Sequence, residues 1–185
     1  MTKLYHILRA AGEAIDRFVA AVGRLTAWLS VSLVLATCIV VLLRYGFGIG
    51  AIALQESALY MYAALFMLGA GYTMSRDGHV RVDVFYRNFN VQQRAWIDIL
   101  GGLFLLIPTA LCMVLLSWDF VAQAWVNREG SIESDGLPFV YLLKTMIPVC
   151  GGLLFLQGLA SVIKNTLVLV GVVPPEAPHV DEVVV

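Results

Sequence analysis

Charged residues divide this chain into four long uncharged runs. The runs cover residues 25–43, 57–75, 99–118 and 145–163, and each holds 19 or 20 residues. At a rise of about 1.5 Å per residue, each run forms a helix of about 30 Å, which matches the hydrocarbon thickness of a bilayer. Pro108 and Pro148 lie inside two of the runs, where we expect bends because neighbouring helices satisfy the carbonyls that proline frees. The pattern predicts an all-α integral membrane protein with four transmembrane helices.

Residues 1–24 carry a different pattern. Apolar residues recur there every three or four positions, as on one stripe of a helix, at Leu4, Leu8, Ala11, Ile15, Phe18 and Val22. Arg9, Glu13 and Arg17 occupy another face, where opposite charges can pair. We predict an amphipathic helix that lies on the cytoplasmic membrane surface or against a partner protein. The alternative is a simple N-terminal extension of the first span.

Two segments beside the membrane domain, which we place at residues 25–171, have less regular patterns. His79 to Val84 alternate like a strand, but an isolated strand beside a bilayer would leave its edges unpaired. We therefore predict a short interfacial helix in the connection from His79 to Trp96. Residues 172–185 contain three prolines, and we expect this tail to be disordered.

Composition and charge agree with a membrane location. Hydrophobic residues make up 60% of the chain and charged residues only 14%, against about 25% charged residues in a typical soluble domain. Twelve basic and 13 acidic residues leave a net charge of −1, so the basic excess that nucleic-acid binding requires is missing. The composition therefore argues against a soluble enzyme and against a nucleic-acid-binding protein, and it favours a membrane protein.

The distribution of Lys and Arg predicts the orientation. The N-terminal segment, the second connection and the C-terminal tail hold nine of these residues, and the first and third connections hold three. Because basic residues are retained on the cytoplasmic side, both termini are predicted to be cytoplasmic and the third connection to face outward. The first run is too long for a signal-peptide core, so we expect it to be retained.

The residue types needed for catalysis or cofactor binding are poorly represented. The three histidines lie outside the runs, so a haem held by histidines on the spans is excluded. Cys38, Cys112 and Cys150 are isolated and are expected to act as small apolar residues. The sequence has no P-loop, GxSxG or HExxH motif. We predict no cofactor, no metal site and no enzymatic activity.

Ion-coupled transport usually requires charged groups near the middle of the membrane, and none of the four runs contains Asp, Glu, Lys, Arg or His. Glu56 is the nearest candidate, at the entrance to the second run and level with Arg44. A helical hairpin could join these two as an interfacial ion pair. Glu56 is either such a solvated or paired boundary residue or part of an ion-binding site. We expect this chain to support another subunit rather than to move a polar solute alone.

Small residues mark possible helix contacts. Gly151 and Gly158 are seven residues apart and share one face of the fourth predicted helix, where a second helix can approach closely. The sequence leaves open whether that second helix belongs to this chain or to a partner.

Several segments resemble the small membrane subunit of TRAP transporters, the DctQ-type permease. They run from Gln55 to Tyr60, from Leu68 to Tyr72 and from Arg76 to Tyr86, the last including the HVRVD stretch. Glu129-Gly130-Ser131, Gly136-Leu137-Pro138, Lys144 with Ile147-Pro148, and Leu156-Gln157-Gly158 resemble one branch of the family, the keto-acid or mannitol/chloroaromatic-like branch. The resemblance extends from about Arg44 to Lys164.

The resemblance implies a tripartite, sodium-driven uptake system for organic acids in the bacterial inner membrane. In such a system a periplasmic solute-binding protein delivers the solute, a large multi-span subunit carries it, and the small subunit is a scaffold for the large one. The candidates for contacts with partners or lipid are Arg44, Glu56, Tyr60, Arg76, His79, Arg81, Asp83, Glu129, Glu133, Asp135, Gly151 and Gly158. Two alternatives are an autonomous four-helix proton-coupled transporter that uses Glu56 and the membrane anchor of a redox complex.

Overall fold

The computed structural model describes residues 2–76 and 89–172. Within these ranges the regular structure is entirely helical: α1 (Thr2–Gly46), α2 (Ile52–Ser75), α4 (Val91–Gly101), the π-helical segment η1 (Gly102–Leu106), α5 (Ile107–Val126) and α6 (Val140–Leu169). The short interfacial helix is predicted in the connection from His79 to Trp96. Residues 79–88 of this connection lie outside the described residues, and α4 begins in the remainder, at Val91. Nearly all of the predicted disordered tail, residues 173–185, also lies outside the described residues.

The prediction of four spans is confirmed. The helices over residues 5–46, 52–75, 91–126 and 140–169 are long and apolar enough to cross a membrane, and each contains one of the predicted runs. Three of the helices continue well past the runs. At about 1.5 Å per residue, the 30 residues of α6 extend over about 45 Å, so this helix must tilt or project beyond the hydrocarbon core.

The N-terminal amphipathic segment is helical, but it is continuous with the first span, which is the alternative that the sequence left open. α1 runs for 45 residues without a proline to end it. Gly12 and Gly23 do not interrupt it, because they face neighbouring helices: Gly12 lies near Ile163 of α6 and Gly23 against the ring of Tyr72 in α2. The packed face is therefore displaced by one residue from the predicted stripe. Phe18 of that stripe is 54% exposed, whereas Val19 is fully buried.

The helix that contains Pro108 changes its hydrogen-bond pattern locally and continues past the proline. In η1, just before the proline, the Ile107 N–H bonds to the Gly102 carbonyl, five residues back. A π-helical turn of this kind absorbs the loss of the proline N–H, and α5 continues directly from η1. At the other end of this stretch, Asn90 begins α4 with a capping box, in which its side chain and that of Gln93 bond each other's backbone N–H groups.

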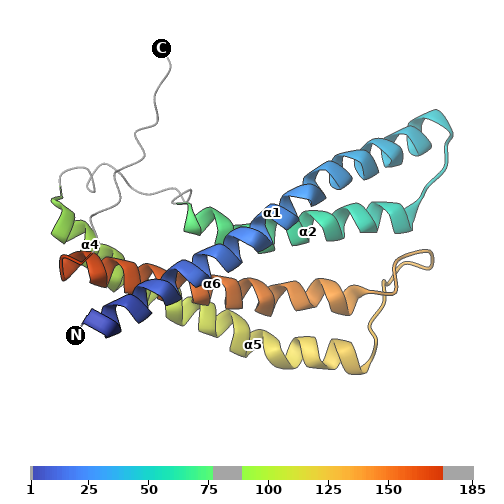
Figure 1. Cartoon of the computed structure of the whole chain (residues 1–185). Helices are drawn as coiled ribbons and strands as arrows, with labels where there is room; N and C mark the ends of the chain where they lie inside the picture. Colours follow the sequence, from blue (N-terminus) through green and yellow to red (C-terminus); the bar gives the residue numbers. More distant parts are fainter. Residues whose placement is uncertain (1, 77–88, 173–185) are drawn as a thin grey trace, which may run out of the picture.

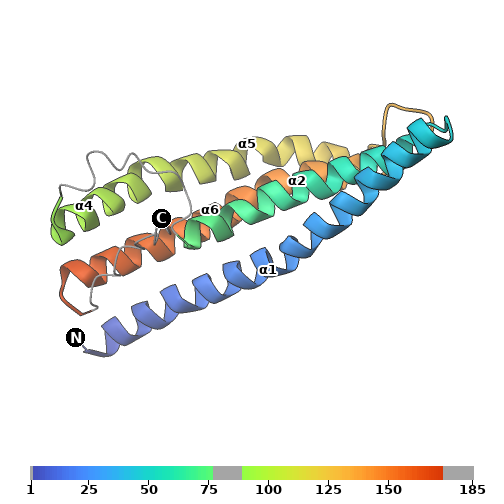
Figure 2. The same ribbon diagram turned by 90° about the horizontal axis from the view of Figure 1, so that it is seen from above.

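α6 is the central helix of the bundle. It packs against α1, α2, α4 and α5, and in Figure 2 it lies between α1 and α5. Small residues allow this close packing. Gly71 of α2 lies against Leu153 of α6 and Val19 of α1, so three helices meet at one glycine.

The bundle has two different ends (Figure 1). The α1–α2 and α5–α6 connections lie at one end, which we call the loop end. The N-terminus, α4 and the last residues of α6 lie at the other, which we call the terminal end. Polar interactions between helices occur near both ends, and each group is described below.

Candidate functional site

At the loop end, Glu56 holds the α5–α6 connection against α2. Its carboxylate accepts a hydrogen bond from the Ser131 hydroxyl, and its second oxygen accepts one from the Leu137 N–H at 2.6 Å. We call Glu56, Ser131 and Leu137 the clasp. Hydrogen bonds to a charged acceptor are stronger than neutral ones, so the clasp fixes the connection firmly to α2. Arg44 does not pair with Glu56, and the ion pair that the sequence allowed is absent.

The connection also bonds to itself. The Ser131 N–H bonds to the Leu137 carbonyl at 3.0 Å, and the Gly136 N–H to the Glu133 carbonyl at 3.1 Å. Residue 136 must be glycine, because a Cβ there would collide with the Ser131 side chain and approach Glu56. In the sequence, Gly136 stood out only as part of the family resemblance. Its close approach to the clasp explains why this position holds a glycine.

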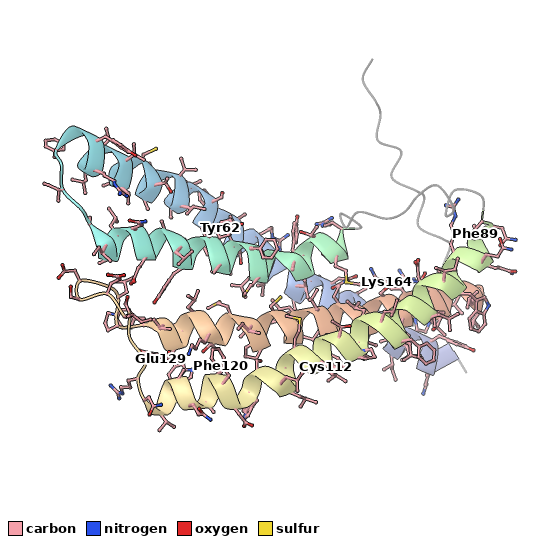
Figure 3. The ribbon with its side chains drawn as sticks, turned by 180° about the vertical axis from the view of Figure 1, so that it is seen from behind. Tyr62, Phe89, Cys112, Phe120, Glu129 and Lys164 are labelled. Carbon is pink, nitrogen blue, oxygen red and sulfur yellow. The ribbon has the colours of Figure 1, made fainter. Side chains whose placement is uncertain are left out.

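A second interaction anchors the start of the same connection, where Figure 3 labels Glu129 and Phe120. Lys144 of α6 forms an ion pair with Glu129 at 2.5 Å, and its ammonium lies 3.9 Å from the centre of the Phe120 ring. Lys144 is 18% exposed, so its charge is largely withdrawn from solvent and is balanced by these two groups. The Trp125 indole N–H bonds to the Thr145 hydroxyl at 2.9 Å and joins α5 to α6 nearby.

These anchors leave a short exposed tip between them. Ile132 is fully exposed, and the neighbouring side chains of Glu133 and Asp135 are also exposed. Of the three acids predicted for partner contact, Glu129 is therefore committed within the chain, and Glu133 and Asp135 remain accessible. Ile132 was not singled out from the sequence, because one isoleucine in a connection carries no periodic signal.

A polar cluster near the terminal end joins α1 to α6. Asp16 forms an ion pair with Lys164, and it accepts a hydrogen bond from the Gln157 side chain at 3.0 Å. Gln157 is only 3% exposed, and its own amide oxygen has no hydrogen-bond partner among the described residues. This cluster leaves no signal in the sequence, because Asp16 and Gln157 are 141 positions apart and neither was expected to contact the other.

The two glycines proposed as helix-contact positions pack within the chain. A Cβ at Gly151 would lie 3.0 Å from the Ala110 carbonyl oxygen of α5, and one at Gly158 would lie 3.0 Å from Leu106 of η1. This settles the question that the sequence left open, since α5 and η1 occupy the face that a partner helix would need.

The remaining candidates are separated from these clusters. Arg44 is exposed in the last turn of α1. Arg76 follows α2, with its guanidinium 5.7 Å from the centre of the Tyr72 ring. The Tyr60 hydroxyl is buried and has no hydrogen-bond partner within the described residues. His79, Arg81 and Asp83 lie outside the described residues.

The polar side chains described above hold helices and connections of this chain together. Within residues 2–76 and 89–172, no group of His, Cys, Asp and Glu side chains could hold a metal ion. Among the described residues, the charged side chains that join different helices or connections include Asp16, Glu56, Glu129, Lys144 and Lys164, and each of these is bound to another group of this chain. Such an arrangement stabilises the contacts between helices.

The comparisons with known proteins give one match. A family model described as "Tripartite ATP-independent periplasmic transporters, DctQ component" matches residues 33–167. The matched segment includes the clasp, the Glu129–Lys144 pair and Lys164, whereas Asp16 precedes it. No curated protein and no solved structure matches the chain significantly.

Proposed function

Because the chain belongs to the DctQ component family of tripartite ATP-independent periplasmic transporters, we propose that it is a scaffold for the large permease subunit in a sodium-coupled organic-acid uptake system. In this role it carries no solute or sodium site. The observation that supports the proposal best is the pairing of its charges. Asp16, Glu56 and Lys144 are all engaged by groups of the chain itself, and none of them lies within the four uncharged runs, so none coordinates a solute in the hydrocarbon core.

The exposed apolar surface supports a role in an assembly. Of the most hydrophobic windows of the four spans, only 11%, 0%, 11% and 33% are buried inside the chain. On α2 the exposed side chains form one helical stripe, with Leu59, Tyr62 and Phe66 all more than half exposed. Lipid covers such a stripe in an isolated subunit, and a large partner subunit would cover part of it in the complex. Tilted, interfacially anchored helices would then enlarge the fixed part of the transporter while a mobile part of the partner moves the solute.

We place the protein in the bacterial inner membrane with both termini in the cytoplasm. The basis is the excess of Lys and Arg in the N-terminal segment, the second connection and the tail. The loop end then faces the periplasm, with the clasp and the exposed tip. Labelling a cysteine introduced at Ser134 with a membrane-impermeant reagent on intact spheroplasts tests this, and protection until the membrane is permeabilised would reverse the orientation.

The exposed tip is the proposed docking point for the periplasmic solute-binding protein. The clasp and the Lys144–Glu129 pair hold the connection in place, so Ile132 is presented without a further cost in ordering the loop. Glu133 and Asp135 flank it and favour a partner surface that is apolar at its centre and basic at its rim. Replacing Ile132 by Ala is expected to raise the concentration of binding protein needed for half-maximal uptake about tenfold. An unchanged half-saturation would contradict docking at this point.

The subunit role itself is tested by reconstitution. This chain, a large permease subunit and a solute-binding protein are placed in vesicles with an inward sodium gradient, and each component is omitted in turn. The expected result is sodium-dependent accumulation of an organic acid only when all three are present. Full uptake without this chain would contradict the scaffold role, and uptake that ignores the sodium gradient would contradict the coupling.

The geometry does not favour the two alternatives. Both oxygens of Glu56 accept hydrogen bonds from the α5–α6 connection, which is a structural use of the carboxylate rather than that of a proton-coupling site. A redox anchor would require its partner to supply the cofactor ligands, since the described residues offer no ligand cluster.

A further inference from the structure

A groove of about 700 Å³ opens at the loop end between α1, α2 and the α5–α6 connection. Its volume is in the range of sites that bind small molecules. Its lining differs along its length. Gln55, Glu56 and Glu133 lie at one end, whereas Leu33, Leu59 and Tyr62 continue the groove along the two helices. Residues 55 and 62 of α2 are about 10 Å apart along the helix axis, so the lining of the groove changes from polar to apolar over about 10 Å.

The polar end carries uncompensated negative charge. Two carboxylates line it, and no Lys or Arg does so among the described residues. The Glu133 side chain has no hydrogen-bond or ion-pair partner within the described part of the chain. Glu56 is engaged in the clasp, but a carboxylate offers about four acceptor positions and the clasp uses two of them. The groove therefore suits a group with a positive charge and several N–H donors at this end.

The apolar end faces lipid. Leu33 and Leu59 lie within two of the runs predicted to cross the hydrocarbon core, and both Leu59 and Tyr62 are more than half exposed. The abundant molecule at this depth is a phospholipid, whose acyl chain can follow the groove while its headgroup reaches the carboxylates. Gln55 adds two N–H donors beside them, which suit a phosphodiester.

We propose that this groove binds a phospholipid with a primary ammonium headgroup. The ammonium lies at Glu133 and Glu56, the phosphodiester near Gln55, and an acyl chain along Leu33 and Leu59. The proposal rests on the groove and its charges in this chain alone. It shares Glu133 with the proposed docking point, but the lipid test is made on the isolated chain and does not depend on docking. A lipid held there would fill the space between the outer halves of α1 and α2 next to the clasp.

The test uses the purified full-length chain and equimolar phosphatidylethanolamine, phosphatidylcholine and phosphatidylglycerol, with bound lipid measured by native mass spectrometry. The wild type is expected to retain phosphatidylethanolamine about tenfold over the other two, because only its headgroup combines positive charge with N–H donors. Glu133→Gln should remove most of this preference. Asp135→Asn is the matched control, since it removes a neighbouring exposed charge that does not line the groove, and it should leave the preference unchanged.

A second variant tests the groove itself. Ala58→Phe places a ring in the lining and should reduce retention of all three lipids, while circular dichroism checks that the helices remain. Equal retention of the three lipids by the wild type would overturn the proposal. So would an equal effect of Glu133→Gln and Asp135→Asn, or a wild-type chain that retains no lipid and leaves the groove for a protein partner.

Discussion

α6 and α2 are both apolar enough to cross a membrane, but they bury their side chains very differently. A third of the most hydrophobic window of α6 is buried within the chain, whereas none of the corresponding window of α2 is. α6 packs small residues such as Gly151, Gly158 and Ala160 against its neighbours. α2 turns Leu59, Tyr62 and Phe66 outward.

The difference shows that apolarity alone does not decide which helices pack tightly in this protein. Because lipid is as apolar as leucine, burying an apolar side chain gains little unless it also fills space between helices. The small residues of α6 allow close backbone approach, and the large residues of α2 are left for lipid or a partner. Cohesion of the isolated chain should therefore depend on α6 and hardly at all on the outer face of α2.

The largest effect is expected at a glycine of α6. Gly151→Leu drives a side chain into the Ala110 carbonyl, which is backbone and cannot move aside, so we expect a loss of about 3 kcal/mol of unfolding free energy. The neighbouring Gly152 has no atom within 4 Å of an added Cβ, and Gly152→Leu is the matched control. SDS-induced unfolding in mixed micelles measures both. Equal losses would mean that the tight α5–α6 contact does not hold the bundle together.

A cavity in α6 should cost less than this clash but more than a truncation on α2. Leu153→Ala removes a side chain that is 6% exposed and lies against Gly71, with an expected loss of about 2 kcal/mol. Phe66 is 70% exposed, and Phe66→Ala should change the stability of the isolated chain by less than about 0.5 kcal/mol. If Phe66→Ala lost more stability than Leu153→Ala in the same assay, the outer face of α2 would stabilise the isolated chain more than the buried face of α6 does.

The contact of α6 with α1 includes the Asp16 cluster. Asp16→Asn removes the charge that Lys164 and Gln157 share, and we expect a loss of about 1–2 kcal/mol. Combining Asp16→Asn with Lys164→Met in a double-mutant cycle isolates the interaction between the two charges. If the two losses simply add, the charges of Asp16 and Lys164 do not stabilise one another, and the contact of α1 with α6 rests on packing and on the Gln157 hydrogen bond.

A loss somewhat smaller than that at Asp16 is expected at the clasp, which gives α2 its polar link to the α5–α6 connection. Glu56→Gln replaces a charged acceptor of two hydrogen bonds by a neutral amide with one acceptor oxygen, and should cost about 1 kcal/mol. Amide hydrogen exchange should accelerate at Leu137 and leave the middle of α6 unchanged. Unaltered exchange at Leu137 would show that the clasp does not hold the connection.

The sequence predicts the four spans well, because the cost of placing charges and unpaired backbone groups in lipid is a local property of each run. The contacts between helices are not local. Glu56 bonds to Leu137, which lies 81 positions away in the sequence. The ion pair between Glu56 and Arg44 that hairpin geometry allowed does not form. The faces of Gly151 and Gly158 were correctly recognised as helix contacts, but only the three-dimensional packing shows which helix fills them.

The N-terminal half of α1 illustrates the same limit. The spacing of its apolar residues predicts a helix, and residues 2–46 are helical. The packed face is displaced by one residue from the stripe that the spacing indicates, and Gly12 and Gly23, which carry no hydrophobic signal, face α6 and α2 there. Hydrophobic periodicity therefore indicates where a helix forms better than it indicates which neighbour the helix contacts.

In the proposed scaffold role, this polypeptide contains no transport site of its own. The most direct measurement places the purified chain alone in sealed vesicles, imposes sodium and proton gradients in turn, and follows labelled organic acids into the lumen. We predict accumulation no greater than in protein-free vesicles under either gradient. Gradient-driven accumulation by the chain alone, abolished in Glu56→Gln, would contradict the scaffold account and make Glu56 a coupling site.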